Sequence, residues 1–293
     1  MSTRKWIIAA LAALLGLCVL LAVVAIPRTP AAQTADVAIL MYHAFTEDEA
    51  ETGSLYTPAS EFARQLSALR DAGYTSVGYS DLIEFVNGEG KLPEKPLLIS
   101  IDDGYQNNLD LAAPLLETYG FCANIAVIGV SIGHTTYKDT DIPITPHFSL
   151  EDARPWIERG VLTVTTHSYD MHQIAAVDGD DCRRGVLQMP DEAEPDYIAA
   201  LTQDYTRAQE QLAGLPGTPL PVFTYPFGAY SELSERVLQE LGVQVTVTIA
   251  NGANRLVKGE PETLRLLHRI HVWRGTKPDM LLSRIDAALQ ALR

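Results

Sequence analysis

Residues 97–104 read Leu-Leu-Ile-Ser-Ile-Asp-Asp-Gly, an apolar run that ends in two adjacent carboxylates and a glycine. Such a run predicts a buried strand that delivers Asp102 and Asp103 to the point where the backbone leaves the sheet. In α/β folds, functional residues gather at that end of the strands. Two like charges so close together are costly unless a cation or a shared proton relieves their repulsion. The stretch therefore predicts a metal site with an adjacent carboxylate base.

A second group of candidate ligands follows another predicted strand, residues 162–165. His167 and His172 both lie directly after it, in a chain with only seven histidines. Two neutral imidazoles and one carboxylate form the ligand set of a catalytic zinc site, which leaves one position open for water or substrate. Non-haem iron oxygenases use the same set, but they do not need a second carboxylate beside it.

Apolar, β-rich runs alternate with helical patterns along the rest of the chain, which predicts parallel strands joined by helices. About seven strands over this length predict a TIM-like (β/α) barrel of parallel strands, complete or incomplete, rather than an open doubly wound sheet, and no dinucleotide-type glycine fingerprint follows the first strand. Residues 178–195 are polar and acidic and predict a surface insertion before a helix that ends near Leu212. The predicted strands are residues 37–42, 75–77, 96–101, 122–128, 162–165, 221–224, 243–248 and 266–272, and predicted helices include residues 59–72, 80–86 with Ser80 as N-cap, and 107–119.

The amino-terminal segment differs from everything that follows. Residues 6–26 carry no charge and are nearly all Ala, Leu, Ile or Val, which is enough to span the hydrocarbon core of a bilayer. Signal-peptide cores are shorter, about 7–15 residues, so we favour an uncleaved transmembrane anchor over a removed signal. Arg4 and Lys5 predict that residues 1–5 stay cytoplasmic. Residues 27–35 would then be a tether, and residues 36–293 a single catalytic domain on the extracytoplasmic side of a bacterial-type cell membrane.

Charge and cysteine content narrow the possible partners. The net charge of −15 and the pI of about 4.8 argue against nucleic acid and against strongly anionic substrates, so a neutral glycan fits better. Outside the predicted anchor only Cys122 and Cys182 remain, which allows one disulfide at most. For Cys122 we prefer a small buried thiol. The sequence carries no signal for the oligomeric state.

Three motifs together resemble the polysaccharide deacetylases, carbohydrate esterase family four. The first two are Asp102-Asp103-Gly104 and His167-Ser168-x-x-x-His172, and the third, residues 223–228, reads Phe-Thr-Tyr-Pro-Phe-Gly. Its Tyr-Pro-Phe-Gly form is found in many bacterial members that act on surface or wall polysaccharide. The resemblance covers about residues 39–272. It implies a distorted, TIM-like (β/α) barrel and a metal-dependent hydrolase that removes N-acetyl groups from N-acetylhexosamine polymers.

The resemblance also implies roles for individual residues. Asp103, His167 and His172 would hold a divalent metal, with zinc the default and cobalt or nickel also compatible. The metal would lower the pKa of its bound water and polarise the amide carbonyl, while Asp102 acts as the general base. Ser168 is expected to orient the ligand loop by hydrogen bonding.

Other residues are expected around this centre. The backbone N–H of Phe227 would stabilise the oxyanion, because Pro226 has no N–H. Tyr225 is expected beside the ligands or in the substrate cleft. Tyr42-His43, which follows Met41, resembles the Tyr-His of surface-polysaccharide deacetylases, and His43 would line the substrate cleft, make a hydrogen bond that supports the site, or have a structural role. His134 lies in a loop rich in Gly, Thr and Pro, as does His147, and both are expected to be solvated.

The sequence departs from the family pattern in the third motif and near the end of the chain. The arginine that usually pairs with the base carboxylate is replaced by Thr224, and Arg269 could supply that charge from the last predicted strand. The family's late Leu-x-His motif, whose histidine is the general acid, fits His268 literally. Strand alternation, however, puts Arg269 and His271 on one face and His268 on the other. We therefore favour His271 as the acid, with His268 at the cleft. The family's Asp-x-x-Asp motif is not found.

Two further functions remain open on the same residues. The site could cleave O-acetyl esters of xylan-type glycans, because the same chemistry hydrolyses esters. Alternatively, the protein could bind glycan without catalysis, which the missing third-motif arginine would favour and the complete ligand set would not.

Overall fold

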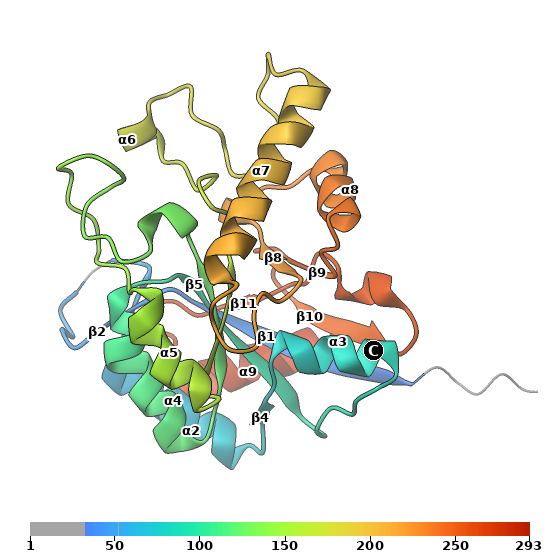
Figure 1. The fold of residues 1–293 in the computed structure, drawn as a ribbon. Helices are drawn as coiled ribbons and strands as arrows, with labels where there is room; N and C mark the ends of the chain where they lie inside the picture. Colours follow the sequence, from blue (N-terminus) through green and yellow to red (C-terminus); the bar gives the residue numbers. More distant parts are fainter. Residues whose placement is uncertain (1–32, 52) are drawn as a thin grey trace, which may run out of the picture. The chain divides into compact units, whose positions relative to one another are not determined.

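The computed structural model describes residues 33–51 and 53–293. Its centre is one mostly parallel sheet that curls on itself, consistent with the predicted TIM-like barrel (Figure 1). The strands are β1 (Thr34–Tyr42), β4 (Thr75–Ser76), β5 (Pro96–Asp103), β6 (Ala123–Val127), β7 (Leu162–Thr166), β8 (Val222–Thr224), β9 (Val245–Val247), β10 (Ala253–Val257) and β11 (Ile270–His271). Neighbouring strands follow the order β10-β1-β5-β6-β7-β8-β9, with β4 beside β5 and β11 beside β1. Two short strands, β2 (Ala44–Thr46) and β3 (Tyr56–Pro58), form a separate parallel pair.

Helices connect the strands and pack on the sheet. They are α2 (Ala59–Asp71), α3 (Tyr79–Asn87), α4 (Ala113–Tyr119), α5 (Leu150–Glu158), α6 (Ala175–Asp178), α7 (Glu194–Leu212), α8 (Glu232–Glu240) and α9 (Pro278–Gln290). None of these has the length and apolar character needed to cross a membrane, a test that covers the described residues only. The predicted anchor, residues 6–26, lies outside them.

Strand β5 lies at the centre of the sheet, between β1 and β6, and all eight of its residues are buried. Its side chains alternate between two faces. Leu97 and Ile99 belong to a large apolar cluster that also contains residues of α2, α4, α5 and α9, whereas Leu98 belongs to a second cluster. Ser100 and Asp102 follow Leu98 at two-residue spacing and share its face. Burial on both faces explains why the sequence of this strand is a continuous apolar run.

Two strands differ from the prediction. Strand β10 is antiparallel to β1 and was not expected, because Asn254 and the exposed Arg255 interrupt its apolar pattern. The strand predicted over residues 266–272 is reduced to the two residues of β11. Leu266 has φ of +54°, which is outside the β region and breaks the extended conformation.

The predictions for helix ends and caps were confirmed only in part. The helix predicted over residues 107–119 begins as a π-helical turn, η1 (Asn108–Ala112), before α4. Helix α3 is capped at Gly78 rather than Ser80, because the Gly78 N–H donates to Asp81 Oδ2 at 2.7 Å. Helix α7 ends at Leu212 as predicted. Cys122 and Cys182 are free thiols within the described residues.

We expect Gly104→Ala to lower the free energy of unfolding by about 2–4 kcal/mol, because it combines left-handed strain with overpacking. Gly104 has φ of +86°, and an added Cβ would lie 2.8 Å from Val127 Cγ1 in β6. Gly120→Ala is the matched control, since φ there is +75° but no atom lies within 4 Å, and it should cost about 1 kcal/mol. Urea unfolding of both variants measures the difference. Equal losses would show that contact with Val127 is unimportant.

Candidate active site

The candidate site lies where parallel strands end along one edge of the sheet. Asp102 and Asp103 are the last residues of β5, His43 directly follows β1, and His167 directly follows β7. Thr224 is the last residue of β8. Since neighbouring parallel strands end on the same side of a sheet, these residues from distant parts of the chain converge.

Three of these side chains form a set that fits a divalent metal. Asp103 Oδ1 lies 3.7 Å from His167 Nε2 and 3.7 Å from His172 Nε2. One ligand atom from each of the three residues lies within 4.8 Å of the others. Two ligand atoms bound to one tetrahedral zinc ion would be roughly 3.4 Å apart, given zinc–ligand distances near 2.1 Å. The observed spacing therefore matches a metal site closely.

His167 is held in the orientation that a ligand needs. Its Nδ1 lies 2.8 Å from the carbonyl oxygen of Thr224, so Nδ1–H donates there and Nε2 keeps a lone pair facing Asp103. Burial lowers the pKa of His167 to about 4, although the neighbouring carboxylates oppose this shift. The imidazole is thus neutral at physiological pH, as metal binding requires. Thr224, which replaces the expected arginine, contributes its backbone rather than its side chain.

Asp102 is paired with Arg269 inside the barrel. The guanidinium Nη1 donates to Asp102 Oδ1 at 2.7 Å and to Ser100 Oγ at 3.0 Å, and Nε donates to the carbonyl of Thr248. Burial alone would raise the pKa of Asp102, but Arg269, with smaller contributions from nearby imidazoles, outweighs it and holds the pKa well below its usual range. Asp102 is therefore ionised, and Arg269 supplies the charge that Thr224 cannot.

Two further imidazoles differ in their contacts. His43 Nε2 lies 3.9 Å from Asp102 Oδ2, on the side of the carboxylate that Arg269 leaves open, and its side chain is 19% exposed. His271 Nε2 instead lies 3.1 Å from the carbonyl oxygen of Ile249, and burial lowers its pKa. The contact with the Asp102 carboxylate is thus made by His43, which was expected to line the cleft, to make a hydrogen bond that supports the site, or to have a structural role.

The turns that carry the three motifs share an unusual backbone conformation. Asp103 (φ +76°), Ser168 (φ +75°) and Phe227 (φ +58°) are non-glycine residues in the left-handed region. Ser168 Oγ accepts a hydrogen bond from the Met171 N–H, which lies in the same loop between the two histidines. The half-exposed ring of Phe227 packs against His172, with ring centroids 4.3 Å apart.

Two residues that were expected near the cleft lie elsewhere. Tyr225 is fully buried, and its hydroxyl donates to Glu235 Oε1 at 2.5 Å. His268 is exposed and lines a pocket with residues of α9, among them Arg284 and Ala287. Both placements follow from strand geometry: Tyr225 faces the layer that α8 covers, and His268 faces away from the buried Arg269.

Some residues near the site were missed by sequence reasoning. Tyr105 directly follows Gly104, and burial together with the adjacent Asp103 carboxylate raises its pKa. His147, expected to be solvated, packs against the Tyr105 ring with centroids 4.8 Å apart, and burial lowers its pKa to about 4. The position of Tyr105 next to the first motif was an available signal. Nothing in the local sequence marks His147.

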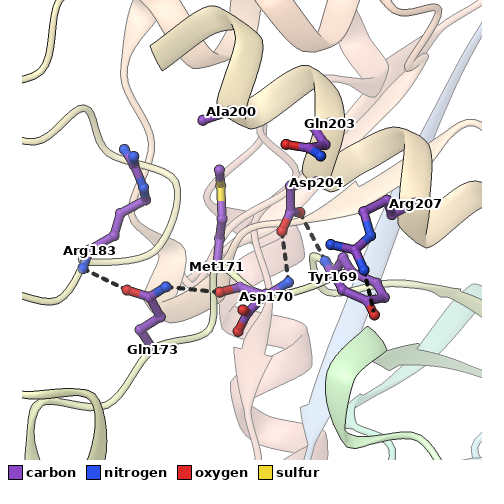
Figure 2. Close-up of a pocket in the computed structure, with 9 residues that line it drawn as sticks. All are labelled: Tyr169, Asp170, Met171, Gln173, Arg183, Ala200, Gln203, Asp204 and Arg207. Carbon is purple, nitrogen blue, oxygen red and sulfur yellow. Dashed lines mark hydrogen bonds between the residues drawn. The ribbon is translucent and has the colours of Figure 1, made fainter. Parts of the chain in front are cut away.

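Asp204 on α7 was also missed, and it contacts the backbone of the loop between His167 and His172. Its carboxylate accepts hydrogen bonds from the N–H groups of Tyr169 and Asp170 (Figure 2). Burial raises the pKa of Asp204 to about 6, although these hydrogen bonds favour the ionised form.

Comparison with known proteins extends the resemblance seen in the motifs. Residues 89–246 match the family model described as polysaccharide deacetylase. YxkH of Bacillus subtilis (strain 168), named for the same family, is 26% identical over 87% of this chain and 76% of its own length. The poly-beta-1,6-N-acetyl-D-glucosamine N-deacetylase of Escherichia coli (strain K12) is 20% identical over 73% of this chain but only 34% of its own length. A solved de-N-acetylase from Aggregatibacter actinomycetemcomitans shares the fold, with a TM-score of 0.73 at 19% identity over 85% of this chain and all of its own.

The buried, neutral state of His167 makes the metal-free protein sensitive to acid. Because its pKa is lowered from 6.5 to about 4, the unfolded chain takes up a proton between these values that the folded chain does not. Acidification from pH 7 to pH 5 should therefore remove about 2 kcal/mol of unfolding free energy through this group. Urea unfolding at both pH values with a chelator present measures the loss. The His167→Gln variant should lose correspondingly less unfolding free energy over the same pH change. An identical loss in both proteins would contradict the lowered pKa of His167.

Proposed function

This chain belongs to the polysaccharide deacetylase family, and we propose that it removes N-acetyl groups from an N-acetylhexosamine polymer of the cell wall or cell surface in a metal-dependent reaction. The convergence of Asp103, His167 and His172 beside the ionised Asp102 carries the proposal. A relative named as a poly-β-1,6-N-acetyl-D-glucosamine N-deacetylase supports the choice of polymer. The net charge of −15 favours an uncharged substrate over an anionic one.

Each residue has a defined task in this proposal. Asp103, His167 and His172 would hold a divalent ion, which supplies a Lewis acid for the amide carbonyl and lowers the pKa of water at its open position. Asp102 accepts the proton of the attacking water at Oδ2, the oxygen that Arg269 does not occupy. Arg269 keeps this carboxylate ionised and fixed. The Phe227 N–H faces the developing oxyanion.

The proton for the departing amine comes from His43 in this proposal. Its Nε2 lies 3.9 Å from Asp102 Oδ2, so it can take up the proton collected by the base or hold its own beside the reacting group. His271 was favoured by strand alternation alone, and its Nε2 is already close to the Ile249 carbonyl. The geometry therefore favours His43 as the acid, with His271 supporting the rim of the site.

Zinc is the metal we propose first, since two imidazoles and one carboxylate form its usual catalytic ligand set, and cobalt or nickel would also fit. We further propose that residues 6–26 anchor the protein and that residues 36–293 act outside the cytoplasm.

Acetate release from chitooligosaccharide, poly-β-1,6-N-acetylglucosamine, peptidoglycan and acetylxylan, with and without chelator, tests the function. Release from acetylxylan alone would indicate an O-acetyl esterase, and release from none would favour a binding protein.

Asp102→Asn should separate catalysis from metal binding. The amide cannot accept the water proton, so we expect acetate release to fall about 10²–10⁴-fold while the bound metal stays near one equivalent. His167→Ala is the complementary variant and should lose the metal itself. Turnover and metal content, measured on the same purified samples, distinguish the two effects. Full activity in Asp102→Asn would rule out its role as base.

His43→Gln and His271→Gln should differ in their effect on the leaving group. For the amide substrate we expect a loss of about 10²-fold or more with His43→Gln and a much smaller one with His271→Gln. An activated aryl acetate releases a phenolate that needs no proton, so His43→Gln should retain most of its activity toward that ester. The reverse order of losses on the amide would restore His271 as the acid.

A further inference from the structure

We propose that Asp204 is a positioning residue, which fixes the loop between His167 and His172 so that both imidazoles converge on Asp103. This inference rests on the metal site of the proposed function. Asp204 lies in the middle of α7, more than thirty positions along the chain from either histidine. It makes no contact with the ligand side chains that would give it a direct role, and so it acts through the backbone.

The contacts of Asp204 are specific to the loop. Its Oδ2 accepts from the Tyr169 N–H at 2.9 Å, and its Oδ1 accepts from the Asp170 N–H at 2.7 Å. Figure 2 shows the carboxylate aimed at these two consecutive N–H groups from the helix above. Tyr169 and Asp170 are the central residues between the two histidines, so the carboxylate binds the backbone of the loop at its midpoint.

The opposite side of the same loop is held by another backbone segment. The carbonyl oxygens of Ser168 and Tyr169 accept from the N–H groups of Gly129 and Val130, at 3.0 and 2.9 Å. At the start of the loop, the His167 N–H donates to the Val127 carbonyl at 2.8 Å. The loop is therefore fixed through its carbonyls by the segment after β6 and through its N–H groups by α7. Without Asp204, one of these two attachments would be missing.

A buried carboxylate at this position lowers the stability of the fold unless hydrogen-bond donors bind its charge. Asp204 is only 7% exposed, and taking an ionised carboxylate out of water is unfavourable without strong donors. Hydrogen bonds from N–H groups to a charged acceptor are about twice as strong as neutral ones. A cavity of about 210 Å³ adjoins the carboxylate and is also lined by Arg183, Gln203 and Arg207. The two hydrogen bonds from the loop therefore offset the cost of burying this charge.

The test compares zinc affinity in Asp204→Asn with that of the full-length wild-type protein, by competition with a chromophoric chelator. The amide oxygen can accept from one N–H, but the amide NH₂ then faces the other. One of the two hydrogen bonds is therefore lost while the shape of the side chain stays the same. We expect zinc affinity to fall about 10–100-fold, the range typical when a group that orients metal ligands is removed. Gln203→Ala, at the same cavity and one position away, is the matched control and should bind zinc like the wild type.

Amide hydrogen exchange on the metal-free proteins provides a second readout. In Asp204→Asn, the amides of Tyr169 and Asp170 should exchange faster, while those of β5 should keep their protection. Wild-type zinc affinity in a folded Asp204→Asn protein would overturn this inference and leave the proposed function intact. Failure of the wild-type protein to bind zinc would instead overturn the metal site on which both proposals rest.

Discussion

The repulsion between two adjacent buried carboxylates is the constraint around which this site is built. Asp102 and Asp103 end a strand that is buried on both faces, where neither charge can be relieved by water. In the folded protein the two carboxylates contact different partners, which offsets their repulsion. Asp102 keeps the strand's alternation and meets Arg269 inside the barrel, whereas Asp103, with φ of +76°, turns toward the two imidazoles. Adjacent residues of the same type thereby acquire different chemistry.

This division depends on parts of the chain that are distant in sequence. The arginine that balances Asp102 comes from the segment before β11, and Thr224 uses its carbonyl to orient His167. One consequence is that the charge on Asp102 and the tautomer of His167 are set by separate elements. A change at the end of β8 would therefore disturb the orientation of His167 before it disturbs the charge on Asp102.

Much of the site could be predicted because its residues follow apolar strands that are easy to recognise. The end of β5 and the histidines after β7 are local patterns, and a parallel sheet brings such strand ends together. Prediction was weaker where extended conformation was assumed: the strand expected from residue 266 to residue 272 is reduced to the two residues of β11, and Leu266, with φ of +54°, interrupts it. Strand β10 was missed because polar residues interrupt its pattern. His147 and Asp204 were missed for a different reason, since their roles come from long-range contacts that no local pattern records.

Backbone strain indicates how tightly the surrounding structure must hold the site. A left-handed conformation costs roughly 1–2 kcal/mol for a residue with a side chain, and Asp103, Ser168 and Phe227 each adopt it at the turns that meet here. Such conformations persist only when neighbouring contacts leave no better alternative. The central position of β5 provides this for Asp103, and the loop contacts from Gly129 and Asp204 provide it for Ser168. The turns at Asp103 and Ser168 are therefore stabilised by the sheet and by α7, and one potential ligand atom from each of Asp103, His167 and His172 lies within 4.8 Å of the others.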